Sequence, residues 1–441
     1  MSAHSRRSQS LARRQGARDV RGVCLVLHRW VGLTIAAFLV VAGLTGAALA
    51  YNEELDAYFA HELWRVADDD APPERDRALL AAQAADVFAA ALPDGATIST
   101  VPLDTPAGRS IRIYVDLPRE SELADEWFVD PRDGSVVGAR RWGDLTEGRR
   151  NLMPFIYRLH YSLALGEAGG VLLGIAALAW TIDCFVAVVL TLPRGAPHAK
   201  RRSWTRWLSV WRRAWRIQRR PAAALIHTSH RALGLWAWAL CFVFAWSAVG
   251  FNLPGVFEPA MRAVGATPVV PASVELTAAT RQTWSLVESP SARLSWSEAL
   301  ERGRVAIHRE AGERGFRIEA ERRLSYDASL RAYRLQVRSS LDVSGRFGAT
   351  SIWIDAQDGR PLGFRSPTET TGDRLTQWLF SLHLATVRTF GSPYEHVVAA
   401  FGVLVAWLSA SGVWMYLRRR GRDACRPRPP NSALRVSPRA P

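Results

Sequence analysis

Four histidines occupy matching places in the two halves of the sequence. His28 and His230 each begin an apolar run, and His160 and His383 each follow a leucine and precede another apolar run. Two imidazoles that face each other from different helices can hold a metal centre between them. A single histidine at a helix end is more commonly an interfacial side chain bonded to a carbonyl, but the matched placement in both halves favours two ligand pairs, His28 with His230 and His160 with His383.

Two further histidines leave the ligand set open. His227 lies three residues before His230, hence on the same helical face, and is the alternative ligand there. His396 follows His383 by 13 positions, and a glycine and a proline interrupt the helix between them. We interpret His396 as structural.

The elements that position these residues are membrane helices. Apolar residues gather in four runs, each close to the ~20 residues that cross a bilayer, at about residues 25–50, 169–192, 233–253 and 397–417. Apart from Arg29 near the start of the first run, Asp183 is the one charged residue inside them. A carboxylate is costly in lipid, so we expect Asp183 to face the bundle interior, either at a functional site or as a packing group.

The chain has a net charge of +15, and its clusters of basic residues are predicted to lie on one side of the membrane. Basic residues gather in the N-terminal tail, in segment 194–220 and at residues 418–420, which all lie on one side if four helices cross. The positive-inside rule makes that side cytoplasmic, together with both termini. The inner loop interleaves Arg with Trp, which predicts contact with membrane lipid; nucleic acid is not an expected partner.

Both long outer loops show the same order of elements. Periodicity predicts a helix over 77–92 followed by strands at 98–103, 110–117 and 126–129, and a helix over 297–311 followed by strands at 316–325, 332–339 and 351–354. The last strand of each loop runs into Asp-x-x-Asp-Gly, at Asp130 and at Asp355, which predicts a hairpin turn and not an acid pair for catalysis. The chain is therefore predicted to be an internal duplication.

These motifs resemble one family. The openings HRWVGL at His28 and HRALGL at His230, the Trp-containing strands before Asp-x-x-Asp-Gly and the paired Leu-His segments are similar to the PepSY-associated transmembrane proteins, over roughly residues 20–420. That family is described as iron-regulated and includes ferric-siderophore reductases. The resemblance implies a membrane α-helical bundle of four transmembrane helices with two periplasmic α+β PepSY-like domains, in the bacterial inner membrane.

The resemblance also implies two haem b groups. His28 and His230 would hold an inner haem, with His227 as the alternative, and His160 and His383 an outer one; Arg29 and Arg231 would neutralise propionates or anchor the helix ends. The chain departs from the family pattern in two places. Residues 226–230 read IHTSH where Asp-x-His-Arg is expected, and residues 382–385 read LHLA where Leu-His-Thr-Gly is expected.

The function implied is a di-haem b electron carrier that reduces a periplasmic ferric siderophore or other iron chelate in iron uptake. Nucleotide-binding fingerprints are absent from the sequence, so the electron donor is expected to be another molecule, a flavoprotein or a quinol. The alternative is a haem-free PepSY binding or regulatory protein that acts on a peptide, protease or transporter. The predicted organisation is a disordered basic tail 1–22, helix 23–51, domain 52–150, interfacial and transmembrane helices 151–193, cytoplasmic loop 194–226, helix 227–253, domain 254–372, interfacial and transmembrane helices 373–418 and a disordered tail 419–441.

Overall fold

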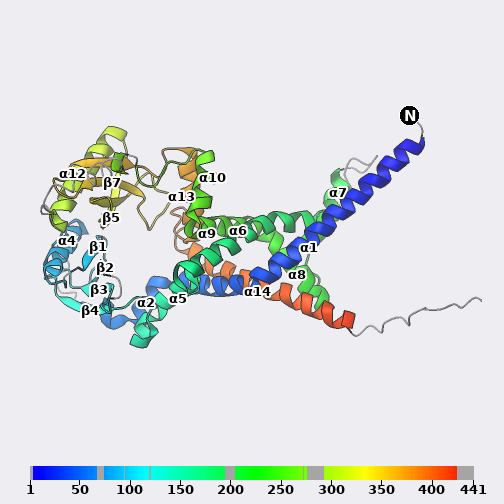
Figure 1. The fold of residues 1–441 in the computed structure, drawn as a ribbon, viewed down its shortest axis with the longest axis horizontal. Coiled ribbons are helices and arrows are strands. Elements are labelled where there is room, and N and C mark those ends of the chain that lie inside the picture. The colour runs from blue at the N-terminus through cyan, green and yellow to red at the C-terminus, as the bar shows by residue number, and fades with distance from the viewer. Residues whose placement is uncertain are drawn as a thin grey trace, which may run out of the picture. The chain divides into compact units, whose positions relative to one another are not determined.

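The computed structural model describes residues 3–66, 74–93, 95–118, 121–193, 204–271, 273–275 and 293–424. The chain divides into two compact units. The first holds residues 1–40, 183–238 and 405–441, and the second holds residues 41–182 and 239–404. The second unit contains the whole β-sheet (Figure 1).

In the part of the chain that the structure describes, three helices are long and apolar enough to cross a membrane: Val20–Leu49 within α1 (Ala3–Leu49), α6 (Gly166–Thr191), and Pro393–Gly421 within α14 (Pro393–Ala424). A fourth span is complete only if α8 (Ala222–Trp236) and α9 (Trp238–Asn252) count as one, since they are bent by 68°. The sequence predicts one helix over 227–253 there. The bend falls at Ala237, where α8 ends and the neighbouring Trp238 indole donates to the Cys184 carbonyl at 3.0 Å.

Two segments that were predicted to be cytoplasmic differ in detail from their predicted form. α1 begins at Ala3, so it includes most of the stretch predicted to be a disordered tail; no proline occurs there to end a helix. The basic loop forms α7 (Trp204–Trp211) and a short η3 (Arg212–Trp215). Residues 425–441 of the predicted C-terminal tail lie outside the described residues.

The sheet is a single antiparallel structure of eight strands in the order β4-β3-β2-β1-β5-β6-β7-β8. Pairing of Thr100–Pro102 with Arg323–Ser325 joins β1 to β5, and thereby the two halves. This junction is not predicted by the sequence. The strands are β1 (Thr97–Pro102), β2 (Ile111–Asp116), β3 (Glu126–Val129), β4 (Val136–Arg140), β5 (Ile318–Asp327), β6 (Ala332–Ser339), β7 (Thr350–Asp355) and β8 (Pro361–Arg365).

Two helices cover one face of this sheet, α4 (Glu74–Ala90) and α12 (Trp296–Arg314) (Figure 1). Alternate strand residues such as Val101, Leu324 and Leu335 point to that face and pack in one core with Leu300 of α12. Ser295 caps α12 in a full capping box, which fixes where the helix begins. The other face carries two smaller apolar clusters, one around Phe128 with Ala60 and Leu63 and one around Trp353 with Val274 and Ala332.

The Asp-x-x-Asp-Gly segments are turns, as predicted. Asp130 Oδ1 accepts the N–H two residues on at 2.9 Å, and Asp355 Oδ1 does the same at 2.8 Å. Gly134 and Gly359 have φ of 75° and 73°, a conformation that glycine adopts without strain. Each turn leads into a return strand, β4 or β8.

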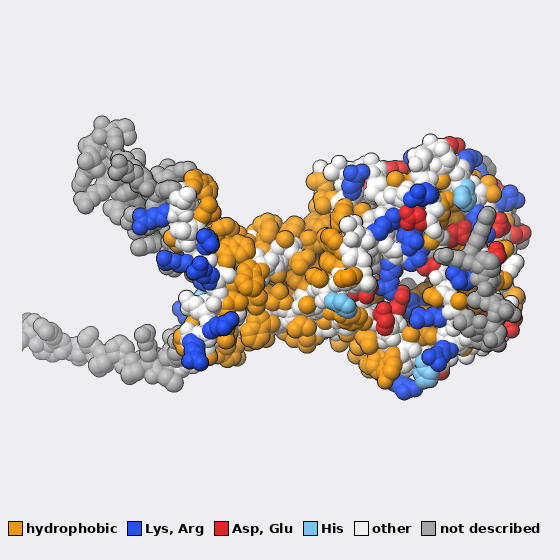
Figure 2. Space-filling model, turned by 180° about the vertical axis from the view of Figure 1, so that it is seen from behind, with side chains coloured by type: hydrophobic (Ala, Val, Ile, Leu, Met, Phe, Trp, Pro, Cys, Tyr) orange, Lys and Arg blue, Asp and Glu red, His pale blue; other side chains and the backbone are white. Residues whose placement is uncertain are grey.

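Short helices connect the sheet to the membrane helices: α2 (Asn52–Phe59), α3 (His61–Trp64), α5 (Leu152–Ser162), α10 (Pro254–Ala263) and α13 (Thr371–His383). A buried ion pair fixes α2 to the first half of the sheet, since the Arg140 guanidinium bonds Asp56 at 2.8 Å and Glu126 at 2.6 Å. On the face shown in Figure 2, hydrophobic side chains dominate the surface of the long helices and charged side chains cover the sheet region.

Candidate functional site: two histidine pairs

The first histidine pair joins α1 to α8. The rings of His28 and His230 have centroids 6.3 Å apart, with an angle of 63° between their planes. His28 Nδ1 lies 2.8 and 2.9 Å from the two carboxylate oxygens of Asp183, on α6. His230 Nδ1 lies 2.9 Å from the hydroxyl of Ser411, on α14. Four helices thus meet at this pair.

The second pair joins α5 to α13. The rings of His160 and His383 have centroids 6.4 Å apart, with an angle of 75° between their planes. His160 Nδ1 lies 3.0 Å from the Thr45 hydroxyl on α1, and His383 Nδ1 lies 2.7 Å from the Ser247 hydroxyl on α9. The Phe244 ring stacks on His383 at 4.6 Å. The second pair therefore repeats the first, with a neutral hydroxyl in place of the carboxylate.

The partners at Nδ1 fix the tautomer of each ring. A carboxylate only accepts hydrogen bonds, so His28 Nδ1 carries the proton that it donates to Asp183. The three hydroxyls already donate to carbonyls of their own helices: Thr45 to Val41 at 2.6 Å, Ser247 to Val243 at 2.6 Å and Ser411 to Leu408 at 2.9 Å. Each hydroxyl must then accept from Nδ1–H.

Nε2 of each ring is consequently left with a lone pair. Among the described residues, the side-chain hydrogen-bond partners of the four rings all lie at Nδ1. A neutral imidazole held at Nδ1 by a hydrogen bond, with its other nitrogen available, is the form in which histidine binds metals.

The spacing of the rings fits one metal between each pair. Imidazole nitrogens bind metal ions at about 2.0–2.1 Å and lie about 1.2 Å from their own ring centre, so two imidazoles on opposite sides of one metal have centroids roughly 6.4 Å apart. The observed 6.3 and 6.4 Å match this value. No group of three or more His, Cys, Asp or Glu that could hold a bare metal ion occurs among the described residues. Each pair therefore suits a metal whose other ligands come from a cofactor, as in haem.

Small residues border both pairs. Gly32 and Gly234 follow His28 and His230 by four residues and so share their helical faces, and a Cβ at either glycine would meet nothing within 4 Å. A Cβ at Gly46 would instead lie 3.0 Å from the His160 ring. The inner pair thus has open space one helical turn away, which a flat macrocycle requires.

Not every predicted residue takes part. His227 is exposed, and His230 is the histidine of α8 that meets His28. Arg231 donates to the carbonyls of Arg213 and Ala214 at 3.0 and 3.1 Å, which fixes η3 to α8. The Arg29 guanidinium lies 5.4 Å from the Trp30 ring. His396 Nδ1 lies 2.6 Å from the Tyr51 hydroxyl, outside both pairs.

At residues 382–385, where the chain has LHLA and the family pattern has Leu-His-Thr-Gly, the backbone conformation explains the expected glycine. Ala385 follows α13 with φ of 57°, in the left-handed region that favours glycine. The glycine expected from the family pattern therefore serves the end of the helix, and alanine takes up the same backbone conformation with some strain.

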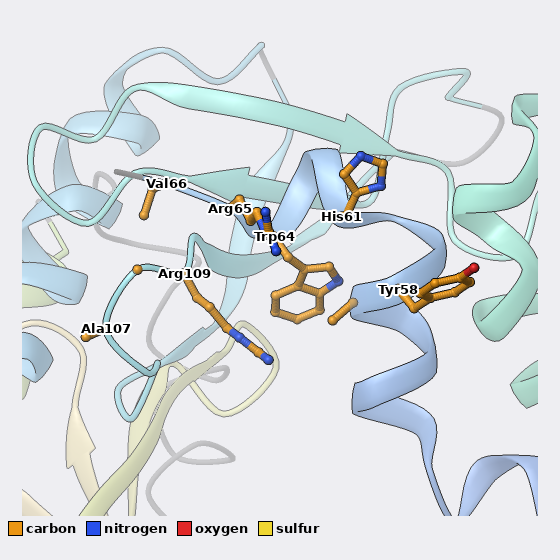
Figure 3. A pocket seen from close by; sticks show the side chains of 9 residues that line it. Tyr58, His61, Trp64, Arg65, Val66, Ala107 and Arg109 are labelled. Carbon is orange, nitrogen blue, oxygen red and sulfur yellow. The ribbon is translucent and has the colours of Figure 1, made fainter. Parts of the chain in front are cut away.

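A pocket of about 660 Å³ lies beside α2 and α3, in the first half of the sheet domain (Figure 3). Figure 3 shows the Arg109 side chain extending past the Trp64 indole, and the Arg109 guanidinium lies 5.8 Å from the Trp64 ring. Tyr58, His61 and Arg65 also line it. Arg65 and Arg109 make the pocket lining basic, which suits a small anionic molecule.

Long apolar helices joined to a sheet domain define a multi-pass membrane protein. The family description PepSY-associated TM region matches residues 25–419, so the chain belongs to that family. No curated protein is similar enough to count as a match.

Proposed function

We propose that this protein carries electrons across the bacterial inner membrane, with both termini in the cytoplasm, and reduces a ferric siderophore or another iron chelate in the periplasm. His28 and His230 hold one haem b, and His160 and His383 hold a second. The observation that carries the proposal is the set of four imidazoles fixed at Nδ1 with a lone pair left at Nε2, arranged in two pairs at metal-spanning distance. An adhesive or regulatory protein has no need of that arrangement.

A haem iron held by two imidazoles changes between Fe(III) and Fe(II) and so passes single electrons. The chain supplies the conditions for it. The hydrogen bonds at Nδ1 orient each ring and raise the basicity of the coordinating nitrogen. The apolar helices exclude water, and Gly32 and Gly234 leave room beside the inner rings.

The two pairs differ in charge. Asp183 places a carboxylate on an inner imidazole, whereas both outer imidazoles bond neutral hydroxyls. Negative charge stabilises the oxidised iron and lowers its reduction potential. A haem held by the inner pair would therefore have the lower reduction potential of the two, the order that electron transfer toward the periplasm would need. The donor on the cytoplasmic side is a flavoprotein or a quinol, and one electron converts Fe(III) in the chelate to the more weakly held Fe(II).

The repeated order of a helix and four strands supports an origin of this architecture by duplication. In this proposal the two PepSY-like halves face the periplasm. Each half contributes one member of each histidine pair, so neither half could hold a haem alone.

The haem count of the purified protein tests the proposal. We expect two b haems per chain by pyridine haemochrome assay and a reduced spectrum with dithionite. His28→Ala or His230→Ala should remove one haem, His160→Ala or His383→Ala the other, and His396→Ala neither. A folded protein without haem would sink the carrier and favour the binding or regulatory alternative.

A further inference from the structure

The face of the sheet opposite α4 and α12 is rich in arginine. Arg323 and Arg334 alternate along their strands with Leu324 and Leu335, which point into the core, so the arginines lie on the other face. The edges of this face are covered: Leu63 packs at Gly138 on β4, and Val274 packs at Gly363 on β8. Arg323 and Arg334 lie between these edges, on neighbouring strands, and both are half-buried.

These two arginines lack the carboxylate partners that their neighbours have. Arg112 lies 3.9 Å from Glu126, and Arg365 lies 3.6 Å from Asp373. Neither Arg323 nor Arg334 forms an ion pair with any carboxylate in the described part of the chain. The Arg334 guanidinium bonds only the Ser351 hydroxyl, at 3.1 and 3.2 Å, and lies 4.7 Å from the Trp353 ring.

The two charges reinforce each other. The register pairs Ser325 with Arg334 and Arg323 with Gln336, so the two arginines are diagonal neighbours, with Cα atoms about 7–8 Å apart. Burial lowers the pKa of Arg334 to about 10, and the positive charges of Arg365 and Arg323 act in the same direction. A half-buried pair of like charges destabilises the fold unless an anion compensates it.

We propose that Arg323 and Arg334 form the binding site for the electron acceptor, an iron chelate whose ligating oxygens carry negative charge. The site rests on the proposed function for the identity of its ligand. Guanidinium groups bind carboxylate and similar oxygen pairs with two parallel hydrogen bonds, and within the described residues both arginines have N–H groups that bond no other side chain or carbonyl. Both arginines belong to the second half, on β5 and β6, next to the β1–β5 junction.

Binding of gallium(III) citrate to the full-length protein in detergent, measured by isothermal titration calorimetry, tests this site. Gallium(III) citrate has the charge and ligands of a ferric chelate and is not reduced. Arg323→Gln and Arg334→Gln should each weaken binding at least about tenfold, because each removes a charged hydrogen-bonding group. Arg309→Gln is the matched control: Arg309 lies on α12 and pairs with Glu313 at 4.0 Å, so its loss should leave binding unchanged.

The outcomes separate the site from the carrier. Unchanged affinity in folded Arg323→Gln and Arg334→Gln proteins would overturn the site, as would an absence of binding by the unaltered protein. Loss of binding on Arg109→Gln alone would move the ligand to the pocket of Figure 3 and also overturn it. Gallium binding needs no haem, so the two proposals can fail separately. If the purified protein lacks haem but its gallium binding depends on the two arginines, the carrier proposal fails and the site stands. If the protein holds two haems but its gallium binding does not depend on the arginines, the site fails and the carrier stands.

Discussion

Replacement of Asp183 by asparagine should raise the reduction potential of the inner haem. The carboxylate oxygen lies 2.8 Å from His28 Nδ1, and the ring and the metal bond add about 4 Å, so the charge lies about 7 Å from a metal held at Nε2. At an effective dielectric constant of about 20, one charge at that distance contributes about 2.4 kcal/mol. For a one-electron couple this corresponds to an upward shift of about 100 mV.

Potentiometric titration of the visible spectrum measures this shift. In the Asp183→Asn protein, the midpoint potential of one haem should rise by about 100 mV and that of the other should stay unchanged. The same change in a His160→Ala background, which keeps only the inner haem, assigns the shifted potential. Ser411→Ala, which removes a neutral partner from the other inner imidazole, is the control and should shift the potential by well under half as much. A potential that stays in place or moves downward in Asp183→Asn would refute the electrostatic role of Asp183.

Three further predictions concern stability. Ala385→Gly should stabilise the protein by about 1 kcal/mol, since it relieves a left-handed alanine, whereas Ala399→Gly inside α14 should destabilise it by a similar amount; thermal unfolding in detergent compares them. Arg140→Met should cost about 3–5 kcal/mol in denaturant unfolding, because two buried carboxylates lose their partner, and a cost under 1 kcal/mol would contradict that role. Hydrogen bonds from the Ser295 backbone and hydroxyl hold the pKa of Glu298 below its ordinary 4.5. The ionised Glu298 therefore stabilises the fold above pH 4.5, and this stabilisation is lost as the pH falls through the lower folded pKa. The difference in Tm between the unaltered protein and Glu298→Gln should vanish in acid.

The sequence predicts the pairing of histidines because each half repeats the same short motif at the same place along a helix. His28 and His230 follow from this repetition, and so do His160 and His383. The strands are predictable for a similar reason, since alternation and Asp-Gly turns are local signals.

The partners of these rings could not be predicted in the same way. Ser411 lies 181 residues from His230, and Ser247 lies 136 residues from His383. A serine in an apolar helix commonly bonds its own helix, as both of these do, so its second bond to an imidazole leaves no trace in the local pattern. Asp183 is the exception, because a lone charge in an apolar run demands a partner.

The junction of the two halves is also a long-range feature. Pairing of β1 with β5 depends on two edge strands more than 200 residues apart, and nothing in either strand alone specifies the other. It removes two exposed edges at once, which an isolated four-stranded half would leave open to aggregation. It also places Arg323, from the second half, two strands from Arg112, from the first. Each histidine pair likewise takes one ring from each half, and the arginine face is continuous across the two halves only because the sheet is.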